Sequence, residues 1–277
     1  MNTAILLATF NSERYLVEQI DSILTQTYAD WVLYIRDDGS TDRTPEIIGK
    51  YLKEYPNRIK LIVDNKGALR SYHNFMELLK IVSADYYLFC DHDDVWLPDK
   101  IEKSMKEMTR IEAAHPVIPV VVHSDMKVVD QNLNVLSDSF WNYSRLLPEC
   151  SSFKDLICCN CVNGCTMLLN ERAKKVSLPN IDYGTMHDSL VAQSVSASQG
   201  VIHAIKEPLV LYRQHIDNVV GAANVRKTYF WGRIQKFEST LKVNYRIWKR
   251  VRHIKSISLF EFMLHNFVIS YKRFSLK

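Results

Sequence analysis

The chain of 277 residues has only eight glycines, and none of them builds the glycine-rich phosphate loops of common nucleotide-binding folds. It contains no GxGxxG dinucleotide loop, no GxxxxGK(S/T) loop and no GxSxG elbow. These absences argue against a GxGxxG dehydrogenase, a P-loop enzyme and an α/β-hydrolase. If the chain binds a nucleotide diphosphate, a metal ion and scattered basic residues must meet most of the phosphate charge.

Long apolar runs are also absent. No run approaches the roughly 18 residues that a membrane-spanning helix needs, and the apolar stretch at residues 4–10 has the length of a strand. The opening MNTAILLATFNSERY shows neither the basic n-region nor the cleavage site of a secretory signal. We therefore expect a cytoplasmic protein, peripheral at the inner face of the plasma membrane.

Six cysteines are present, and four of them lie in the segment CCNCVNGC. Cys158 and Cys161 have the CxxC spacing of a zinc site. No second CxxC or HxxxH follows, and free cysteine is a common small buried residue. We therefore favour buried free thiols over zinc, and disulfides are not expected in the cytoplasm.

The composition, 47% hydrophobic and 24% charged, is that of a globular protein with a sizeable core. Strands are predicted at residues 3–9, 31–36, 59–63 and 86–90, with amphipathic helices between them. This alternating order implies an α/β fold with a mostly parallel central sheet flanked by helices. From residue 116 the pattern changes to short strands at 119–123, 126–130, 164–169, 201–205 and 209–212, and one helix at 186–198.

The stretch YYLFCDHDDVW is the most informative part of the sequence. An apolar strand ends in Asp91-His92-Asp93-Asp94, and apolar residues return at once. Three carboxylates at the end of a buried strand repel one another, so a cation is expected among them. Asp91 and Asp93 are two residues apart, so both side chains can reach one Mg²⁺ or Mn²⁺ that carries a diphosphate. The alternative is a solvated acidic turn.

A second polar cluster, Asp37-Asp38-Gly39-Ser40, follows the strand at residues 31–36. Ligands of parallel sheets bind outside the carboxyl ends of the strands, so both clusters should border one crevice. A carboxylate there can accept the N3–H of a uracil or thymine ring. The alternative is a turn that leads into the helix at Thr44-Pro45.

With these motifs the sequence resembles the inverting family 2 glycosyltransferases, which have the A-type glycosyltransferase fold. ATFNSERYLVEQIDSILTQTYADWVLYIRDDGSTDRT is similar to the family's opening segment, and CDHDDVWLPDKIEK resembles the DQDDVW form of its metal motif. MHDSLVAQ and LVLYRQH resemble its later catalytic-base and lid segments. The likeness covers residues 2–221 in the family's motif order and is strongest to rhamnosyltransferase-like enzymes of bacterial surface polysaccharides.

The resemblance implies a dTDP- or UDP-sugar donor and a polysaccharide or lipid-linked saccharide acceptor. Residues 1–221 would form the catalytic domain, with a nucleotide-sugar half at 1–115 and an acceptor half at 116–221. The implied donor residues are Ala8, Thr9 and Phe10 at the base, Glu13 near the ribose, Asp38 at the base edge, Asp91 and Asp93 at the diphosphate through Mn²⁺ or Mg²⁺, and Arg70, Arg213 and His215 near the phosphates.

In the same resemblance Asp188 takes the role of general base. It lies at the start of a predicted helix, where the helix dipole favours an ionised carboxylate. A carboxylate with an ordinary pKa near 4 is ionised at neutral pH and can take the proton of an acceptor hydroxyl. Attack opposite the leaving nucleotide would invert the anomeric centre. The alternative is that His187 and Asp188 cap the helix, and both roles can coexist.

Residues 222–277 are predicted to form a separate basic helical region. Residues 225–277 carry 13 Lys and Arg against two Glu, whereas the remainder has 22 Lys and Arg against 29 Asp and Glu. Apolar residues recur at helical spacing at Phe230, Ile234, Phe237, Leu241, Tyr245 and Trp248. We expect this region on an anionic membrane surface. The alternative is packing on the catalytic domain, and the acidic remainder disfavours nucleic acid.

The sequence therefore predicts a metal-dependent inverting glycosyltransferase of the hexosyltransferase class. Two alternatives stay open. One is an inactive sugar-nucleotide-binding or scaffold protein of a polysaccharide assembly. The other is a nucleotidyltransferase with a similar sheet, which would normally carry a glycine- and basic-rich N-terminal loop that ATFNSER lacks.

Overall fold

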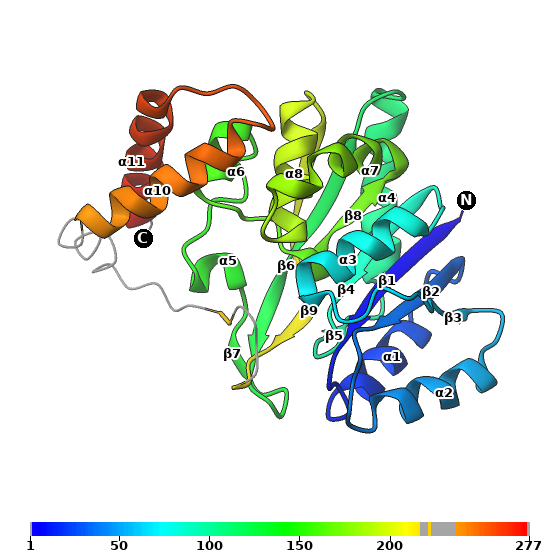
Figure 1. Ribbon diagram of the computed structural model, residues 1–277. Helices are drawn as coiled ribbons and strands as arrows, with labels where there is room; N and C mark the ends of the chain where they lie inside the picture. The colour runs from blue at the N-terminus through cyan, green and yellow to red at the C-terminus, as the bar shows by residue number, and fades with distance from the viewer. Residues whose placement is uncertain (1, 217–220, 223–236, 276–277) are drawn as a thin grey trace.

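The computed structural model describes residues 2–216, 221–222 and 237–275 (Figure 1). Its centre is one mixed sheet in the order β3-β2-β1-β4-β8-β6-β9-β5, with β7 paired to β6. The strands are β1 Thr3–Thr9, β2 Trp31–Asp37, β3 Ile59–Leu61, β4 Tyr86–Cys90, β5 Val95–Trp96, β6 Val120–Val129, β7 Val135–Ser137, β8 Leu168–Asn170 and β9 Val201–Arg213.

The first four strands are parallel, as the alternating pattern predicts. β1 lies between β2 and β4, with Ile5 opposite Leu33 on one side and Leu88 on the other. Both faces of β1 are buried: Ile5 belongs to one core cluster and Leu6 to the other. The carboxyl ends of β1, β2 and β4 consequently meet at one edge of the sheet, where the polar clusters begin.

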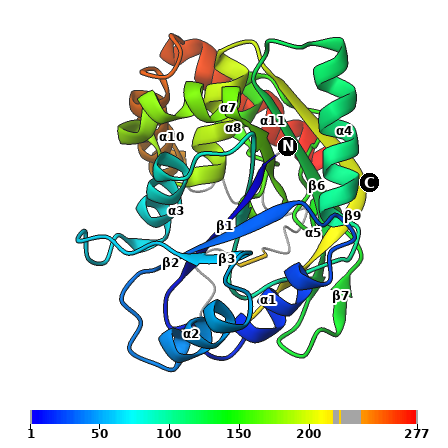
Figure 2. The ribbon, with the colours of Figure 1, turned by 90° about the vertical axis from the view of Figure 1, so that its right-hand side faces the viewer.

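Helices cover both faces of the sheet (Figure 2). Apolar residues of α1, α2 and α4 fill one core cluster, and those of α3, α7 and α8 fill the other. The helices are α1 Leu16–Leu24, α2 Thr44–Glu54, α3 Arg70–Ile81, α4 Lys100–Ala114, α5 Phe140–Tyr143, α6 Phe153–Cys158, α7 Glu171–Ser177, α8 His187–Ala197, α10 Phe237–Val251 and α11 Leu259–Ser275, with short 3-10 turns at Gly164–Thr166 and Leu178–Tyr183.

The second half differs from the prediction in its strands. The segments expected as separate strands at 119–123 and 126–130 form the single strand β6, and those at 201–205 and 209–212 form β9. These two strands pair in parallel, and the register shifts where Asp125 lies opposite Pro208. The interruption in each pattern is therefore an irregularity inside a paired strand and not a turn.

The two C-terminal helices pack on the rest of the chain through α6. Phe262 of α11 is fully buried in a cluster with Phe153 and Ile157 of α6. This contact supports the packing alternative for one side of the region. Phe230 and Ile234 of the predicted apolar stripe lie outside the described residues, and the division at residue 221 stays a prediction. In the described part of the chain, no helix has both the length and the apolarity to cross a bilayer.

Candidate functional site

The polar ends of β1, β2 and β4 meet in one cavity of about 880 Å³. Asp38 just after β2 donates its amide hydrogen to the Thr9 carbonyl at the end of β1, at 2.9 Å. The convergence expected for the strand ends is therefore found, and the cavity extends to α8 in the second half. The expected site residues that line it are Ala8, Thr9, Phe10, Asp38, Arg70, Asp91, Asp93, Asp188 and His215.

Phe10 and Asp38 offer two different kinds of surface to a ligand. The Phe10 ring is 54% exposed, so a flat apolar face is available for stacking. Asp38 is buried, and its Oδ1 accepts hydrogen bonds from the Arg36 side chain at 2.8 Å and the Leu69 amide at 2.7 Å. Its Oδ2 accepts one bond, from the Arg70 amide at 2.7 Å, which leaves capacity for another donor.

A buried arginine, Arg36, holds this end of the cavity in place. Its guanidinium donates to both Asp64 oxygens, at 2.9 and 3.0 Å, and to the Asn74 carbonyl oxygen at 3.2 Å. The bond from Arg36 lowers the pKa of Asp64 to about 2. Asp37 accepts bonds from Ser40 and so closes the turn beside it. The turn alternative for the second polar cluster therefore applies at Asp37, whereas Asp38 lines the cavity and its contact with a base stays a prediction.

The turn between β4 and β5 brings carboxylates together. Among the described residues, the Asp91 carboxylate has no hydrogen-bond or ion-pair partner. Burial, with the nearby charges of Asp93 and Asp188, raises the pKa of Asp91 to about 8. Asp93 Oδ2 lies 2.8 Å from His215 Nε2. Burial alone would raise the pKa of Asp93, but this bond and the charges of His92 and His215 keep it below its ordinary value.

These residues fit a divalent cation. A carboxylate with a raised pKa among like charges becomes ionised when a cation joins it. Mg²⁺ and Mn²⁺ prefer carboxylate oxygens and leave positions for phosphate and water. Asp94 and Cys165 also have ligand atoms within 4.8 Å of one from Asp91. Burial raises the pKa of the Cys165 thiol well above its ordinary value, so it is a poor ligand for a hard ion. Asp91 and Asp93 both line the cavity, and their expected pairing at a metal ion stays a prediction.

Arg213 supports the acidic turn from within the protein. Its Nε donates to the Asp93 carbonyl at 2.8 Å, its amide to Asp94 Oδ1 at 3.1 Å, and its guanidinium pairs with Glu18. The side chain is 1% exposed and is not among the residues that line the cavity. This arrangement differs from the expected phosphate contact, because the guanidinium already binds a carboxylate and backbone carbonyls. Asp94 is fully buried in this arrangement.

Asp188 enters the cavity from the first turn of α8. Burial raises its pKa to about 6, against the hydrogen bonds from the backbone amides of Ser189 and Gly164 that lower it. His187 beside it packs against Phe75 and Phe89, with ring centroids 4.1 and 4.7 Å apart. Burial lowers the pKa of His187 to about 3, so its ring is neutral at physiological pH. His187 therefore supports the site as an aromatic packing residue.

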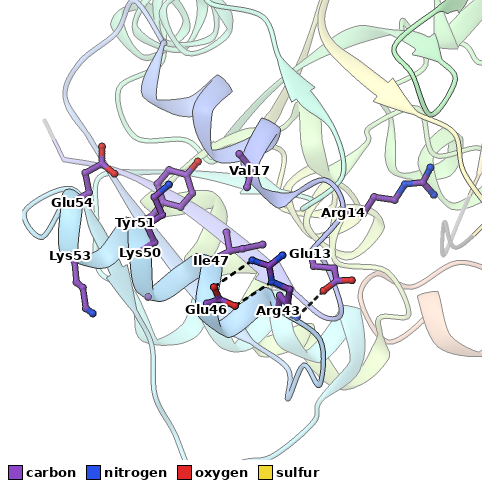
Figure 3. Close-up of a pocket in the computed structure, with 11 residues that line it drawn as sticks. Glu13, Arg14, Val17, Arg43, Glu46, Ile47, Lys50, Tyr51, Lys53 and Glu54 are labelled. Atoms are coloured by element: carbon purple, nitrogen blue, oxygen red, sulfur yellow. Dashed lines mark hydrogen bonds and ion pairs between the residues drawn. The ribbon is translucent and has the colours of Figure 1, made fainter.

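Glu13 lies in a different groove, which runs from the N-terminal end of α1 along the length of α2 (Figure 3). Its carboxylate accepts the Arg43 amide hydrogen at 2.9 Å, and Arg43 pairs with Glu46. Glu13 is not among the residues that line the large cavity. Its assignment to the ribose stays a prediction, as do the individual roles of the residues that do line the cavity.

Several residues that line the cavity were not expected from the sequence. In the first half they include Tyr15 and Asn74. In the second half, where no strand-end pattern marks them, they include Phe140 of α5, Gly164 after α6 and Met186 before α8. Tyr212 of β9 also lines the cavity, and it lies inside the segment LVLYRQH that had been singled out. No disulfide joins any of the six cysteines, all of which lie in the described part of the chain, and within that part Cys158 and Cys161 belong to no group of three metal-ligating side chains.

Comparison with known proteins decides the family. Residues 4–176, more than half of the chain, match the family described as Glycosyl transferase family 2. The chain belongs to glycosyl transferase family 2. The resemblance read from the motifs is thereby confirmed, and so is the expected enzyme class at the level of the family.

Curated relatives of this family 2 chain come from several bacteria. EpsE of Bacillus subtilis, named as a glycosyltransferase, is 32% identical over 53% of the chain and 48% of its own length. The dTDP-rhamnosyl transferase RfbG of Shigella flexneri is 26% identical over 78% of the chain and 74% of its own length. WfgD of Escherichia coli is a UDP-Glc:alpha-D-GlcNAc-diphosphoundecaprenol beta-1,3-glucosyltransferase. It is 28% identical over 53% of the chain and 55% of its own length. The chain thus spans about half the length of EpsE and WfgD.

Solved structures share the fold. S. aureus TarS 1–349 in complex with UDP-GlcNAc superposes with a TM-score of 0.63 and 16% identity, covering 100% of this chain and 74% of that one. The mannosyltransferase PcManGT from Pyrobaculum calidifontis, in complex with GDP-Man and Mn²⁺, gives a TM-score of 0.50 with 15% identity, covering 96% and 73%. The predicted α/β glycosyltransferase fold is confirmed by this likeness.

Proposed function

We propose that this chain is a metal-dependent inverting glycosyltransferase that moves a sugar from a dTDP- or UDP-sugar to a saccharide acceptor. The observation that carries the proposal is the single cavity that Phe10, Asp38, Asp91, Asp93 and Asp188 line together. Its volume of about 880 Å³ lies in the range of small-molecule and cofactor sites. A base-stacking ring, an acidic metal pair and a separate carboxylate are the parts that such a transfer needs.

Phe10 and Asp38 would bind the base. The exposed Phe10 ring would stack on it, and Asp38 Oδ2 would accept the N3–H through its remaining acceptor capacity. Uracil and thymine carry this N3–H, whereas neutral cytosine has an acceptor at that position. Arg36 keeps the carboxylate oriented for this bond. The arrangement supports a dTDP or UDP donor over a cytidine nucleotide.

Asp91 and Asp93 would hold Mn²⁺ or Mg²⁺ at the diphosphate. A bound ion of this kind neutralises charge that develops on the leaving nucleoside diphosphate. Arg70 is exposed at the cavity, within reach of an anionic ligand. His215 orients Asp93 through the 2.8 Å bond, while Arg213 fixes the backbone of the turn from behind. Arg213 thus acts on the phosphates only by positioning Asp93.

Asp188 would act as the general base. A pKa of about 6 leaves the carboxylate mostly ionised at neutral pH and closer to the working pH than an ordinary aspartate. It would take the proton of the acceptor hydroxyl as the oxygen attacks the anomeric carbon. Attack from the face opposite the departing diphosphate inverts that carbon, and the buried, neutral His187 ring keeps the start of α8 in position.

The acceptor is proposed to be a polysaccharide or a lipid-linked saccharide, met at the inner face of the plasma membrane. The printed activity of WfgD, which uses a diphosphoundecaprenol-linked acceptor, supports a lipid-linked acceptor. The printed activity of RfbG supports a dTDP-sugar donor. The packing of α10 and α11 on α6 places the basic region on the half of the chain that contributes Asp188.

Release of nucleoside diphosphate from UDP- and dTDP-sugars tests the proposal. With Mn²⁺, the protein should release the nucleoside diphosphate by slow donor hydrolysis, and faster with acceptor present. Nuclear magnetic resonance of the product should show an inverted anomeric configuration. No release from any sugar nucleotide, with binding intact, would instead identify an inactive binding or scaffold protein. Release of pyrophosphate from a nucleoside triphosphate would identify a nucleotidyltransferase.

A further inference from the structure

Helix α11 is apolar on two opposite faces. One face, with Phe262 and Ile269, is buried at 0% and 1% exposure against α6 and the loop after α5. On the other face Phe260, Leu264 and Val268 are 79%, 55% and 37% exposed. Their spacing of four residues aligns them along the helix, and we call these three the α11 stripe. A helix that packs on one side of a domain usually exposes polar residues on its other side, and α11 does not.

Neighbouring residues enlarge this exposed apolar surface. Phe267 and Tyr271 lie on the same face of α11 and are 58% and 55% exposed. Soluble proteins commonly expose single apolar side chains that are scattered over the surface. Five large apolar side chains along three turns of one helix are more than such a scatter. Helix α11, which carries these residues, lies next to α10 and away from α1 and α2 (Figure 1).

Helix α10, which lies next to α11, adds positive charge to this end of the molecule (Figure 1). Lys242, Arg246 and Lys249 are exposed, and their spacing of four and three residues places them on one face of α10. Trp248 donates its indole N–H to the Ile257 carbonyl at 2.9 Å, which ties α10 to the segment that leads into α11. The basic face and the α11 stripe thus belong to one connected unit.

This unit is fixed to the acceptor half of the site. His265 Nε2 of α11 lies 2.8 Å from Asp155 Oδ1 of α6. Arg273 donates to the Arg145 carbonyl at 2.8 Å, and Arg145 donates to the Arg273 carbonyl at 2.9 Å. Arg145 follows α5, whose Phe140 lines the cavity. A surface bound by α10 and α11 would therefore be held at a fixed position relative to the cavity.

We propose that the α11 stripe and the basic face of α10 dock the protein on an anionic lipid bilayer, the stripe entering the interface and the lysines and arginine binding headgroups. This inference rests on the proposed function for its purpose, the delivery of a lipid-linked acceptor. Apolar and aromatic side chains next to Lys and Arg are the chemistry that anionic lipid surfaces select. Glu261, which follows Phe260, forms an ion pair with Lys154. A two-fold dimer through the same face is disfavoured, because it would bring together two basic regions that repel each other, each with net charge +11 over residues 225–277.

The test is co-sedimentation of the full chain with vesicles of phosphatidylcholine alone or with 30% phosphatidylglycerol, at low and high salt. The wild type should bind the anionic vesicles, and weakly or not at all the neutral ones. The variant Phe260→Ser/Leu264→Ser/Val268→Ser should bind at least tenfold more weakly. Its matched control, Val63→Ser/Val117→Ser/Val135→Ser, removes exposed apolar residues elsewhere and should bind as the wild type does.

A second pair of variants tests the charge. Lys242→Gln/Arg246→Gln/Lys249→Gln should lower the vesicle partition coefficient about 100-fold at low salt, since each basic residue near an anionic surface adds roughly a factor of five. Lys50→Gln/Lys53→Gln on α2 should leave vesicle binding unchanged. High salt should weaken wild-type binding, because the charge attraction is screened.

Three outcomes would overturn the proposal: no binding of the wild type to anionic vesicles, equal binding by the stripe variant and its control, or a fall in molar mass of the stripe variant by light scattering with vesicle binding unchanged. The last would make a second copy the occupant. Nucleoside diphosphate release should be the same in the wild type and the stripe variant. A protein that binds vesicles but releases no nucleoside diphosphate would refute the proposed reaction without contradicting the docking surface.

Discussion

Replacing Asp188 by Asn removes the proposed base and little else. The amide has nearly the shape of the carboxylate and can still accept the hydrogen bond from the Ser189 amide. The side chain is 9% exposed and lies at the start of α8, so the fold should survive the change. The expected loss is therefore confined to proton transfer from the acceptor.

The expected loss of rate in Asp188→Asn follows from the proposed role of Asp188 as general base. A positioned general base contributes roughly 10²–10⁴-fold to rate, or about 2.7 to 5.4 kcal/mol of activation free energy. With a pKa of about 6, roughly 97% of Asp188 is ionised at pH 7.5. At that pH nearly every wild-type molecule therefore carries Asp188 in the ionised form that can act as a base. Because the base acts only when ionised, wild-type kcat/KM should fall as the pH drops through about 6, with a slope approaching one.

The assay compares transfer, donor binding and pH dependence in the same preparations. Asp188→Asn should transfer about 10²–10⁴-fold more slowly, bind UDP or dTDP with unchanged affinity, and lose the acidic limb near pH 6. Glu46→Gln is a matched control, because Glu46 is also an acidic residue in the first turn of a helix but is exposed, and among the described residues its carboxylate pairs with Arg43. A loss smaller than tenfold, or an acidic limb retained in Asp188→Asn, would refute the assignment.

Three further changes test the other parts of the site. Asp93→Asn should abolish the activity that Mn²⁺ restores after chelation, since one of the two proposed ligands is lost, and enzyme assays across a Mn²⁺ titration would measure it. Phe10→Ala should weaken donor binding by about 1–3 kcal/mol, the worth of stacking one base, as measured by calorimetry with UDP and dTDP. Gly164→Ala should destabilise the fold by about 1–3 kcal/mol, because the new Cβ would lie 2.2 Å from His187 Nε2, and thermal unfolding would show the loss.

Each of these changes has a control within the chain. Asp138→Asn alters an exposed aspartate that pairs only with Lys127, and it should keep full Mn²⁺ activation. Val63→Ala removes an 82% exposed apolar side chain and should not affect nucleotide binding. Gly49→Ala lies in α2 with nothing within 4 Å of the new Cβ, so it should unfold at the wild-type temperature or slightly above. Equal effects of a change and its control would contradict the corresponding role.

The first half of the fold and the position of its site could be predicted from the sequence. Residues 3–9 form a continuous apolar run because both faces of β1 are buried, and polar residues follow β1, β2 and β4 where the strands leave the core. Strand ends of a parallel sheet meet at one edge, so Asp38 and Asp91 were expected to border one crevice. Local pattern and sheet geometry were sufficient for that prediction.

The rest depends on contacts between distant residues. Arg213 was expected at the phosphates, but Glu18, 195 residues away, binds its guanidinium. No local pattern predicts that pair. Likewise, the shift where Asp125 meets Pro208 lies within two paired strands, and in sequence it is indistinguishable from a turn. The sequence also does not indicate which side of α11 is exposed, because the two apolar faces of the helix differ only in what packs against them.

The most direct measurement of the central claim is thermal unfolding in a panel of nucleotide sugars with Mn²⁺ or with a chelator. At 100 times the dissociation constant, a donor should add about 2.7 kcal/mol to the free energy of unfolding, or roughly 5 °C or more in melting temperature. The account predicts this shift for UDP- or dTDP-sugars with Mn²⁺, and a much smaller one with chelator or in Asp93→Asn. No shift with any nucleotide sugar, or equal shifts with and without Mn²⁺, would contradict it.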